Sequence, residues 1–218
     1  MRRAGGFLVV AVAALAVAGC GGSKQTAATT TTIDSHGCAE VTQPPPTQRT
    51  EDKPTSKLDP SRTYDVTFQT NCGNFTVRLA VKQSPNTTAS FVHLVQKSFF
   101  DHTLFHRIAP GFVIQGGDPT QSGQGGPGYT TVDTPPKGTK YVHGTVAMAK
   151  TQAQPPGTGG SQFFIVTAAD AGLPPDYAVL GHVVKGIGTV DRIGQLGNAN
   201  EVPIEPVVIE RATVANSG

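Results

Sequence analysis

The sequence of 218 residues contains no tryptophan, and aromatic residues make up only 6% of it. Charge is also scarce, since charged residues account for 15% of the chain and the formal net charge is +2. No run of Lys or Arg extends beyond Arg2-Arg3, so the sequence lacks the basic stretches with which proteins bind nucleic acids. No nucleic-acid partner is therefore expected.

The sequence also lacks an apolar run long enough to span a bilayer. The longest run extends from Phe7 to Ala18, about twelve residues, whereas a transmembrane helix needs roughly 20. Because Arg2-Arg3 precedes it, the run fits the hydrophobic region of a signal peptide. A permanent membrane helix is not expected.

Small residues precede the first cysteine, in the string Val17-Ala18-Gly19-Cys20. This string resembles the lipobox of bacterial lipoproteins, in which cleavage exposes the cysteine for attachment of diacylglycerol. The resemblance implies a lipoprotein signal peptide over residues 1–19 and a lipidated Cys20. It also implies an extracytoplasmic protein that is lipid-anchored to the bacterial cell membrane. The alternative is an ordinary secretory signal whose cleavage site lies near a cysteine.

Residues 20–57 contain few apolar residues and are rich in Thr, Ser, Gln and Pro. Such a segment buries too little surface to offset the entropy of ordering, so we predict that it is a disordered tether. It contains Cys38, and with Cys20 lipidated the remaining partner for a disulfide is Cys72. In an oxidising compartment we expect these two cysteines to pair, with two free thiols as the alternative.

One folded domain is predicted over residues 58–214, with a short tail at 215–218, because a chain of this length has room for one ordinary domain plus extensions. The 26 glycines and 17 prolines predict many turns between short strands. Alternating apolar residues predict a β-hairpin over 64–81. Further short strands are expected at 104–108, 112–115, 144–149, 162–167, 178–184 and 206–211.

Two helices are expected among these strands. Ser84 followed by Pro85 is typical of a helix start, and apolar residues at helical spacing follow, which predicts an amphipathic helix over about 85–97. A weaker pattern favours a second helix over about 188–195. Many short strands with two helices indicate an antiparallel β fold, and closure into a barrel would remove its exposed edges.

Several familiar motifs lack the context that their chemistry needs. Gly123–Gly128 matches GxGxxG, but no strand precedes it and no helix follows it. His102 and His106 have a spacing seen in zinc sites, but no third ligand lies nearby. No serine stands in a Gly-x-Ser-x-Gly string, and Cys72 has no motif that pairs it with a histidine. Neither a cofactor nor a metal is expected.

Two strings place polar groups among large apolar side chains. The first reads FHRIAPGFVIQGGD from Phe105 to Asp118, and the second reads GSQFFI from Gly160 to Ile165. A single Arg or Gln flanked by Phe is usually a surface residue. Here two segments combine a polar side chain with neighbouring Phe residues, which weakens that interpretation. Together the strings resemble the cyclophilin family of peptidyl-prolyl cis-trans isomerases, and the resemblance covers essentially the whole folded part.

The resemblance implies a mainly β fold, a closed eight-stranded antiparallel β-barrel capped by two α-helices. It implies an enzyme that isomerises X-Pro bonds in proline-containing polypeptide substrates without a cofactor or a metal. It assigns catalysis to Arg107, Phe112 and Gln115. The residues that it assigns to substrate binding are Val113, Ala149, Lys150, Gln162, Phe164, Leu173 and Tyr177.

Three positions depart from the family pattern. Lys150 replaces the usual asparagine, Gly172 stands where many eukaryotic members have a tryptophan, and Tyr177 stands where they have a histidine. The changes at Gly172 and Tyr177 leave open a proline-peptide binding module or holdase without turnover. A third alternative is an envelope lipoprotein that serves only as a spacer. The reading we favour is a monomeric isomerase that assists the folding of exported or cell-envelope proteins.

Overall fold

The computed structural model describes residues 32–218. The proposed signal peptide at 1–19 and the proposed lipidation site at Cys20 lie outside the described residues. Across the described range, no helix has both the length and the apolar character that crossing a membrane requires.

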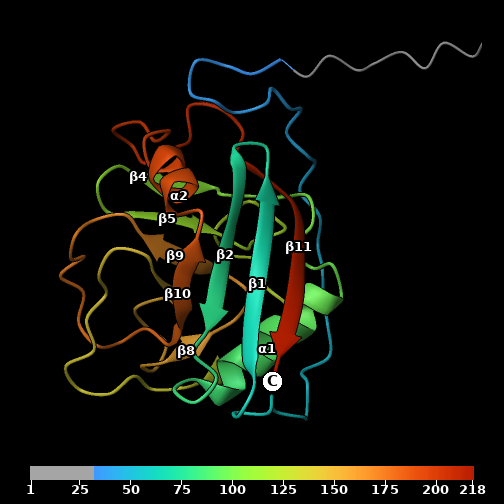
Figure 1. Ribbon diagram of the computed structural model, residues 1–218, viewed down its shortest axis with the longest axis vertical. Helices are drawn as coiled ribbons and strands as arrows, with labels where there is room; N and C mark the ends of the chain where they lie inside the picture. Colours follow the sequence, from blue (N-terminus) through green and yellow to red (C-terminus); the bar gives the residue numbers. More distant parts are fainter. Residues whose placement is uncertain (1–31) are drawn as a thin grey trace, which may run out of the picture. The chain divides into compact units, whose positions relative to one another are not determined.

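A nine-stranded antiparallel sheet dominates the fold, in the order β3-β11-β1-β2-β10-β7-β9-β5-β4, and β6 and β8 form a separate pair (Figure 1). The strands of the large sheet are β1 (Thr63–Thr70), β2 (Gly73–Leu79), β3 (Thr103–Leu104), β4 (Arg107–Ala109), β5 (Val113–Gly116), β7 (Thr145–Met148), β9 (Phe163–Val166), β10 (Val179–Lys185) and β11 (Val208–Ser217). The small pair consists of β6 (Thr131–Val132) and β8 (Thr158–Gly159).

The large sheet is a curled half-barrel whose edges do not close, whereas the expectation was a closed eight-stranded barrel. Its edge strands β3 and β4 are neighbours in the chain, separated only by Phe105 and His106. Within the described chain no ladder joins these edges, and one isolated bridge pairs Leu104 with Asp118. The expected strand at 104–108 is thus two short strands, because the chain crosses from one edge to the other at Phe105 and His106.

Both expected helices are present. Helix α1 (Pro85–Gln96) begins with proline at its first turn, where the missing N–H costs no hydrogen bond. Its buried residue Phe91 packs edge-on against Phe163 of β9, with ring centroids 5.6 Å apart. Helix α2 (Ile187–Ile193) lies next to β2 and buries Val190 and Ile193.

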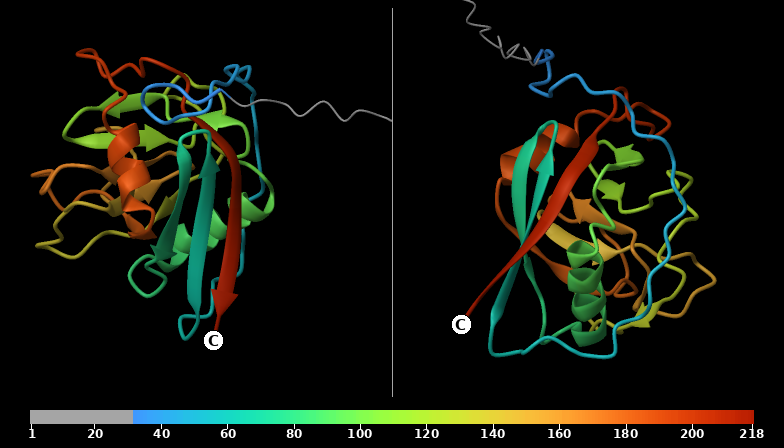
Figure 2. Two further views of the ribbon diagram at one scale, coloured as in Figure 1. Left: turned by 45° about the horizontal axis from the view of Figure 1, so that its top comes forward. Right: turned by 90° about the vertical axis from the view of Figure 1, so that its right-hand side faces the viewer.

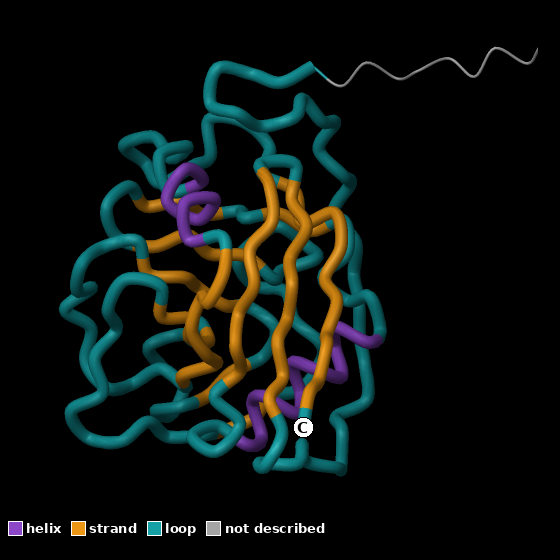
Figure 3. The backbone as a smooth tube through the Cα atoms, viewed as in Figure 1, coloured by secondary structure: helices purple, strands orange, loops and turns teal. Residues whose placement is uncertain are grey.

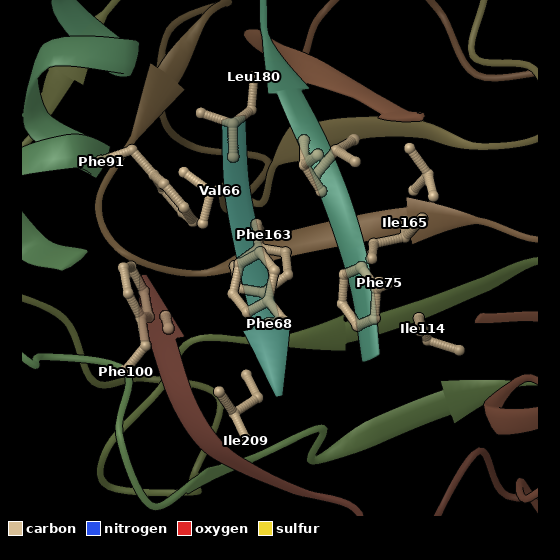
Figure 4. Packing of buried hydrophobic residues seen from close by; sticks show 14 of the residues in the cluster. Val66, Phe68, Phe75, Phe91, Phe100, Ile114, Phe163, Ile165, Leu180 and Ile209 are labelled. Carbon is tan, nitrogen blue, oxygen red and sulfur yellow. The ribbon is translucent and has the colours of Figure 1, made fainter. Parts of the chain in front are cut away.

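The core inside the curled sheet is built from phenylalanines that different elements contribute. Phe68 of β1 stacks on Phe75 of β2 with centroids 4.9 Å apart, and Phe163 lies 5.3 Å from Phe68 (Figure 4). The rings of Phe91 and Phe100 stack at 4.7 Å. Each buried ring contributes about 1.5–3 kcal/mol through removal of apolar surface from water.

Strand β11 extends further than the sequence indicated. It pairs with β1 along the whole length of that strand, from Thr70 opposite Ile209 to Thr63 opposite Ser217. The predicted tail at 215–218 is therefore part of the sheet through Ser217. The tail is polar and exposed, and its order comes from backbone pairing, which composition does not reveal.

Residues 38–57, here called the strap, lie along the folded domain (Figures 2 and 3). Thr47 donates its backbone N–H to Pro119 O at 2.9 Å, and Glu51 donates its own to Pro127 O at 3.0 Å. The prediction of a disordered tether is therefore wrong for the strap. Its composition is poor in apolar residues, but backbone hydrogen bonds and a covalent crosslink hold it in place.

The crosslink is a disulfide between Cys38 and Cys72, whose Cα atoms are 4.0 Å apart. Cys72 lies at the turn between β1 and β2, and both cysteines are buried. Next to it, Asn71 Nδ2 donates to Ala39 O at 2.9 Å. The start of the strap is thus fixed to the central hairpin of the sheet.

Replacing both cysteines by serine, Cys38→Ser with Cys72→Ser, is expected to lower the free energy of unfolding by about 2–4 kcal/mol. The crosslink spans a sequence separation of 34 residues, and in the chain-entropy account it restricts the unfolded chain over that loop. Urea unfolding with and without dithiothreitol measures the effect. The reductant should destabilise the wild-type protein and leave the double variant unchanged. Equal stabilities in the absence of reductant would contradict the expectation.

Candidate active site

The register of the sheet brings two of the three expected catalytic residues together. Arg107 of β4 pairs with Gln115 of β5, Gln115 pairs with Phe164 of β9, and Phe164 pairs with Ala147 of β7. Side chains of directly paired residues project to the same face of a sheet. This paired row, Arg107-Gln115-Phe164-Ala147, therefore lies on one face, opposite the inward-pointing Ile114.

Hydrogen bonds run between the polar side chains of this face. Arg107 Nη1 donates to Gln115 Oε1 at 3.2 Å, and Gln115 Nε2 donates to Gln162 Oε1 at 3.1 Å. Gln162 Nε2 in turn donates to Gly125 O at 2.9 Å. These hydrogen bonds orient the side-chain amides of Gln115 and Gln162. They also link the Arg107 guanidinium to the loop that contains Gly125.

Glu201 holds the other side of the guanidinium. Its Oε2 accepts a hydrogen bond from Arg107 Nε at 2.6 Å, and its backbone oxygen accepts one from Ile108 N at 3.0 Å. The residue has a φ of +61°, in the left-handed region that non-glycine residues rarely adopt. Glu201 is not recognisable from the sequence, because it lies 94 residues after Arg107 and no local motif marks it.

An apolar cluster separate from the main core lies on the same face as the paired row. Its buried members are Ala109, Val113, Tyr141, Ala147, Phe164 and Val166. Partly buried residues packed against it include Phe112, Ala149, Leu173 and Tyr177. The structure thus brings the expected wall residues into one outer cluster, which stays partly open to solvent.

Tyr141, a fully buried member of this outer cluster, was not singled out in the sequence. Its hydroxyl donates to Tyr177 O at 2.6 Å and accepts from Tyr177 N at 2.9 Å. Burial raises the pKa of the Tyr141 hydroxyl, and it outweighs the hydrogen bonds that lower it. Tyr177 then meets Phe164 edge-on, with ring centroids 5.4 Å apart. The two tyrosines fix one side of the apolar wall.

Lys150 lies beside Tyr177, on the same side of the outer cluster. Its side chain is only 3% exposed, and its Nζ lies 2.6 Å from Asp176 Oδ2 and 5.6 Å from the centroid of the Tyr177 ring. The ammonium is therefore engaged within the protein. That the Lys150 backbone contacts substrate stays a prediction.

A groove of about 800 Å³ lies beside the outer cluster. Gln115, Ala149, Lys150 and Gln162, all expected site residues, line it together with the loop 117–130. Gln115 and Gln162 therefore border an open space with room for a peptide.

The loop 117–130 is organised around the fully buried Asp118. Its carboxylate accepts hydrogen bonds from the backbone N–H of Thr120 at 2.7 Å, of Gly123 at 2.7 Å and of Gly125 at 3.1 Å. Burial raises the pKa of Asp118, but the hydrogen bonds outweigh burial and the pKa lies below its ordinary value. The carboxylate thus stays charged and holds the loop in shape.

Comparison with known families identifies the relatives of this chain. A sequence model described as cyclophilin type peptidyl-prolyl cis-trans isomerase matches residues 65–214. Peptidyl-prolyl cis-trans isomerase-like 1 of Aspergillus fumigatus is 36% identical over 159 residues, which cover 71% of this chain and 97% of the relative. A peptidyl-prolyl cis-trans isomerase of Arabidopsis thaliana is 37% identical over 155 residues, covering 69% and 93%.

Solved structures agree with these matches. The crystal structure of a cyclophilin type peptidyl-prolyl cis-trans isomerase from Cryptosporidium parvum is 30% identical and has a TM-score of 0.65, covering 72% of this chain and 99% of its own. The same Cryptosporidium protein crystallised in the presence of the dipeptide Ala-Pro gives a TM-score of 0.64.

Substituting Glu201 by glutamine is expected to reduce kcat for isomerisation of a Xaa-Pro test peptide about threefold to tenfold. The substitution removes the charge that holds Arg107 Nε, so the guanidinium samples more orientations. KM should change less than kcat, and the ¹⁵N resonance of Arg107 Nε should shift. The matched control is Glu205→Gln, a carboxylate of the same loop that faces His36. Unchanged kcat together with an unchanged Arg107 resonance would argue against this role.

Proposed function

The chain belongs to the cyclophilin-type peptidyl-prolyl cis-trans isomerase family, and from this premise we propose that it acts on X-Pro bonds of exported or cell-envelope proteins. In this proposal the enzyme is lipid-anchored and assists the folding of those proteins. The isomerase activity belongs to the family and to the matched relatives. The proposal adds that the substrates are exported or cell-envelope proteins and that the enzyme is anchored to the membrane by lipid.

The reaction is a rotation about a bond with partial double-bond character. Planar X-Pro amides interconvert across a barrier of about 18–20 kcal/mol, because rotation breaks the resonance of the C–N bond. At the half-rotated transition state the nitrogen lone pair is localised and accepts a hydrogen bond. An interaction made only in that state lowers the barrier in both directions equally.

The observation that carries the mechanism is the position of Arg107 beside the outer cluster. Glu201 and Gln115 occupy two of the five N–H groups of the guanidinium, which leaves donors for a bound chain. A donor aimed at the proline nitrogen bonds it when it is pyramidal and not when it is planar. A bond of about 3–4 kcal/mol in a dry site corresponds to two to three decades in rate.

The apolar residues supply the grip on the substrate. A pyrrolidine ring is apolar and compact, and partly exposed Phe112 and Leu173 lie against the buried Val113 and Phe164. Binding the ring there would place its nitrogen on the face that carries Arg107, because Val113 and Gln115 project to the same side of β5. No proton transfer is needed, so the mechanism uses no acid or base.

The substitution Arg107→Ala is expected to lower kcat/KM at least about a hundredfold with the fold intact, since the transition-state donor is lost. Arg107→Lys retains charge but loses the planar fork, so it should recover only part of the activity. A protease-coupled assay on a Xaa-Pro peptide measures both, and circular dichroism checks folding. Near-wild-type activity of the alanine variant would overturn the assignment. The same assay separates an isomerase from a binding module without turnover.

The location rests on two features of this chain. The string that ends in Cys20 resembles a lipobox, and it lies outside the described residues. The disulfide between Cys38 and Cys72 is typical of proteins in oxidising compartments. The two sequence relatives described above come from a fungus and a plant, so they give no support to a lipoprotein form.

Substituting Cys20 by alanine is expected to move the protein from the membrane fraction to the soluble fraction of cells. Diacylglyceryl and acyl chains together anchor a protein stably in a membrane. Without them the variant has no apolar run long enough to span the bilayer. Immunoblotting of separated fractions and intact-mass measurement check the location and the lipid. The matched control is Cys38→Ala, which should stay with the membrane. Wild-type protein found only in the soluble fraction would refute the anchor.

A further inference from the structure

The strap contributes a residue to the groove beside the paired row. Gln48 lines this groove together with Gln115 and Gln162. It lies well before residue 65, where the match to the family begins. The groove of this protein therefore includes a residue from outside the shared domain.

Hydrogen bonds fix the strap on both sides of Gln48. Thr47 N bonds to Pro119 O, and Glu51 N bonds to Pro127 O, so the main chain of Gln48 is held between two points of one loop. Gln48 itself is exposed, which makes it accessible to a chain bound in the groove. A group held in place before binding costs less entropy when it forms a hydrogen bond.

The groove is continuous with the catalytic site. Gln162 lines the groove and accepts a hydrogen bond from Gln115, which in turn accepts one from Arg107. A polypeptide whose proline lies at the outer cluster would thus extend its flanking residues into the groove. The occupant that the geometry points to is the substrate itself, at positions beyond the X-Pro pair.

The side chains that line the groove are mostly uncharged. Amides, hydroxyls and glycine backbone form most of its lining, including Gln48, Thr120 and Ser122. The one charged side chain of the lining is Lys150, which is paired with Asp176 at 2.6 Å. A charged substrate side chain would lose water here without gaining a counter-ion, whereas a neutral amide or hydroxyl would exchange one hydrogen bond for another.

We infer that Gln48 is a specificity-determining residue of this isomerase, which binds the substrate chain flanking the proline and favours an uncharged polar side chain there. The strap then serves as part of the substrate site. The inference rests on the isomerase activity of the family. It does not depend on the cell-envelope location, so a soluble wild-type protein would leave it standing.

The test uses the full domain with its strap and two kinds of peptide with the same Xaa-Pro core. The short peptide ends at the residues next to the core, and the extended peptides carry Gln, Ala or Glu two positions from the proline, on each side in turn. We expect the wild-type protein to have its highest kcat/KM for a Gln-bearing extended peptide. In Gln48→Ala the ratio of kcat/KM for that peptide to kcat/KM for the short one should fall about threefold to tenfold.

A charge substitution makes the test sharper. Gln48→Lys should raise kcat/KM for the Glu-bearing peptide relative to the Gln-bearing one, because it places a cation in a groove that lacks a free one. The matched control is Gln43→Ala, five residues earlier on the strap, whose side chain bonds to Gln121 and does not line the groove. It should keep the wild-type ratio.

Two results would overturn the inference. One is a ratio in Gln48→Ala equal to that of the wild-type protein. The other is an equal fall of the ratio in Gln43→Ala, which would show that loosening the strap, and not the loss of the Gln48 amide, changes the preference for extended peptides.

Discussion

The position of one guanidinium is the constraint around which the site is built. Arg107 is held through Nε by Glu201 and through Nη1 by Gln115, which lie 94 and 8 residues after it in the sequence. An arginine side chain alone has many rotamers, and two anchored edges reduce them to a narrow set. The row of paired residues on β4, β5 and β9 then fixes where the remaining N–H groups lie relative to the apolar wall.

The alternation of the strands explains why the same segments serve both stability and catalysis. Ile114 and Ile165 face the inner core, whereas Val113 and Phe164, one residue away in each strand, belong to the outer cluster. A shift of register by one residue would exchange the two faces. The bulk of the inner core, which Phe163 and its aromatic neighbours fill, therefore protects the geometry of the site as well as the fold.

The sequence was most informative where the chemistry is local. Arg107, Phe112, Val113 and Gln115 lie within one short string, and strand alternation with a family resemblance was enough to place them. Glu201 is 94 residues away, and its role depends on a loop conformation with positive φ, which no periodicity encodes. The sequence also did not predict that the sheet stays open. That feature depends on where Phe105 and His106 cross from the edge strand β3 to the edge strand β4.

Amino-acid composition gave a wrong expectation of disorder at both ends of the domain. The strap and the end of β11 are polar, so a rule that equates order with apolar content predicts disorder for both. Their order comes from backbone hydrogen bonds to neighbours far away in sequence, such as Thr47 to Pro119 and Ser217 paired with Thr63. Counting the cysteines was enough to predict the Cys38–Cys72 disulfide. It did not predict that this bond holds an ordered segment.

The disulfide also determines how mechanical load enters the domain. Tension applied to the chain before Cys38 passes through the covalent bond into the turn between β1 and β2, and it bypasses the strap that follows. The hairpin is embedded in the sheet between β11 and β10, so it resists such a pull over many hydrogen bonds at once. The groove and its Gln48 are thereby shielded from forces that would otherwise peel the strap away.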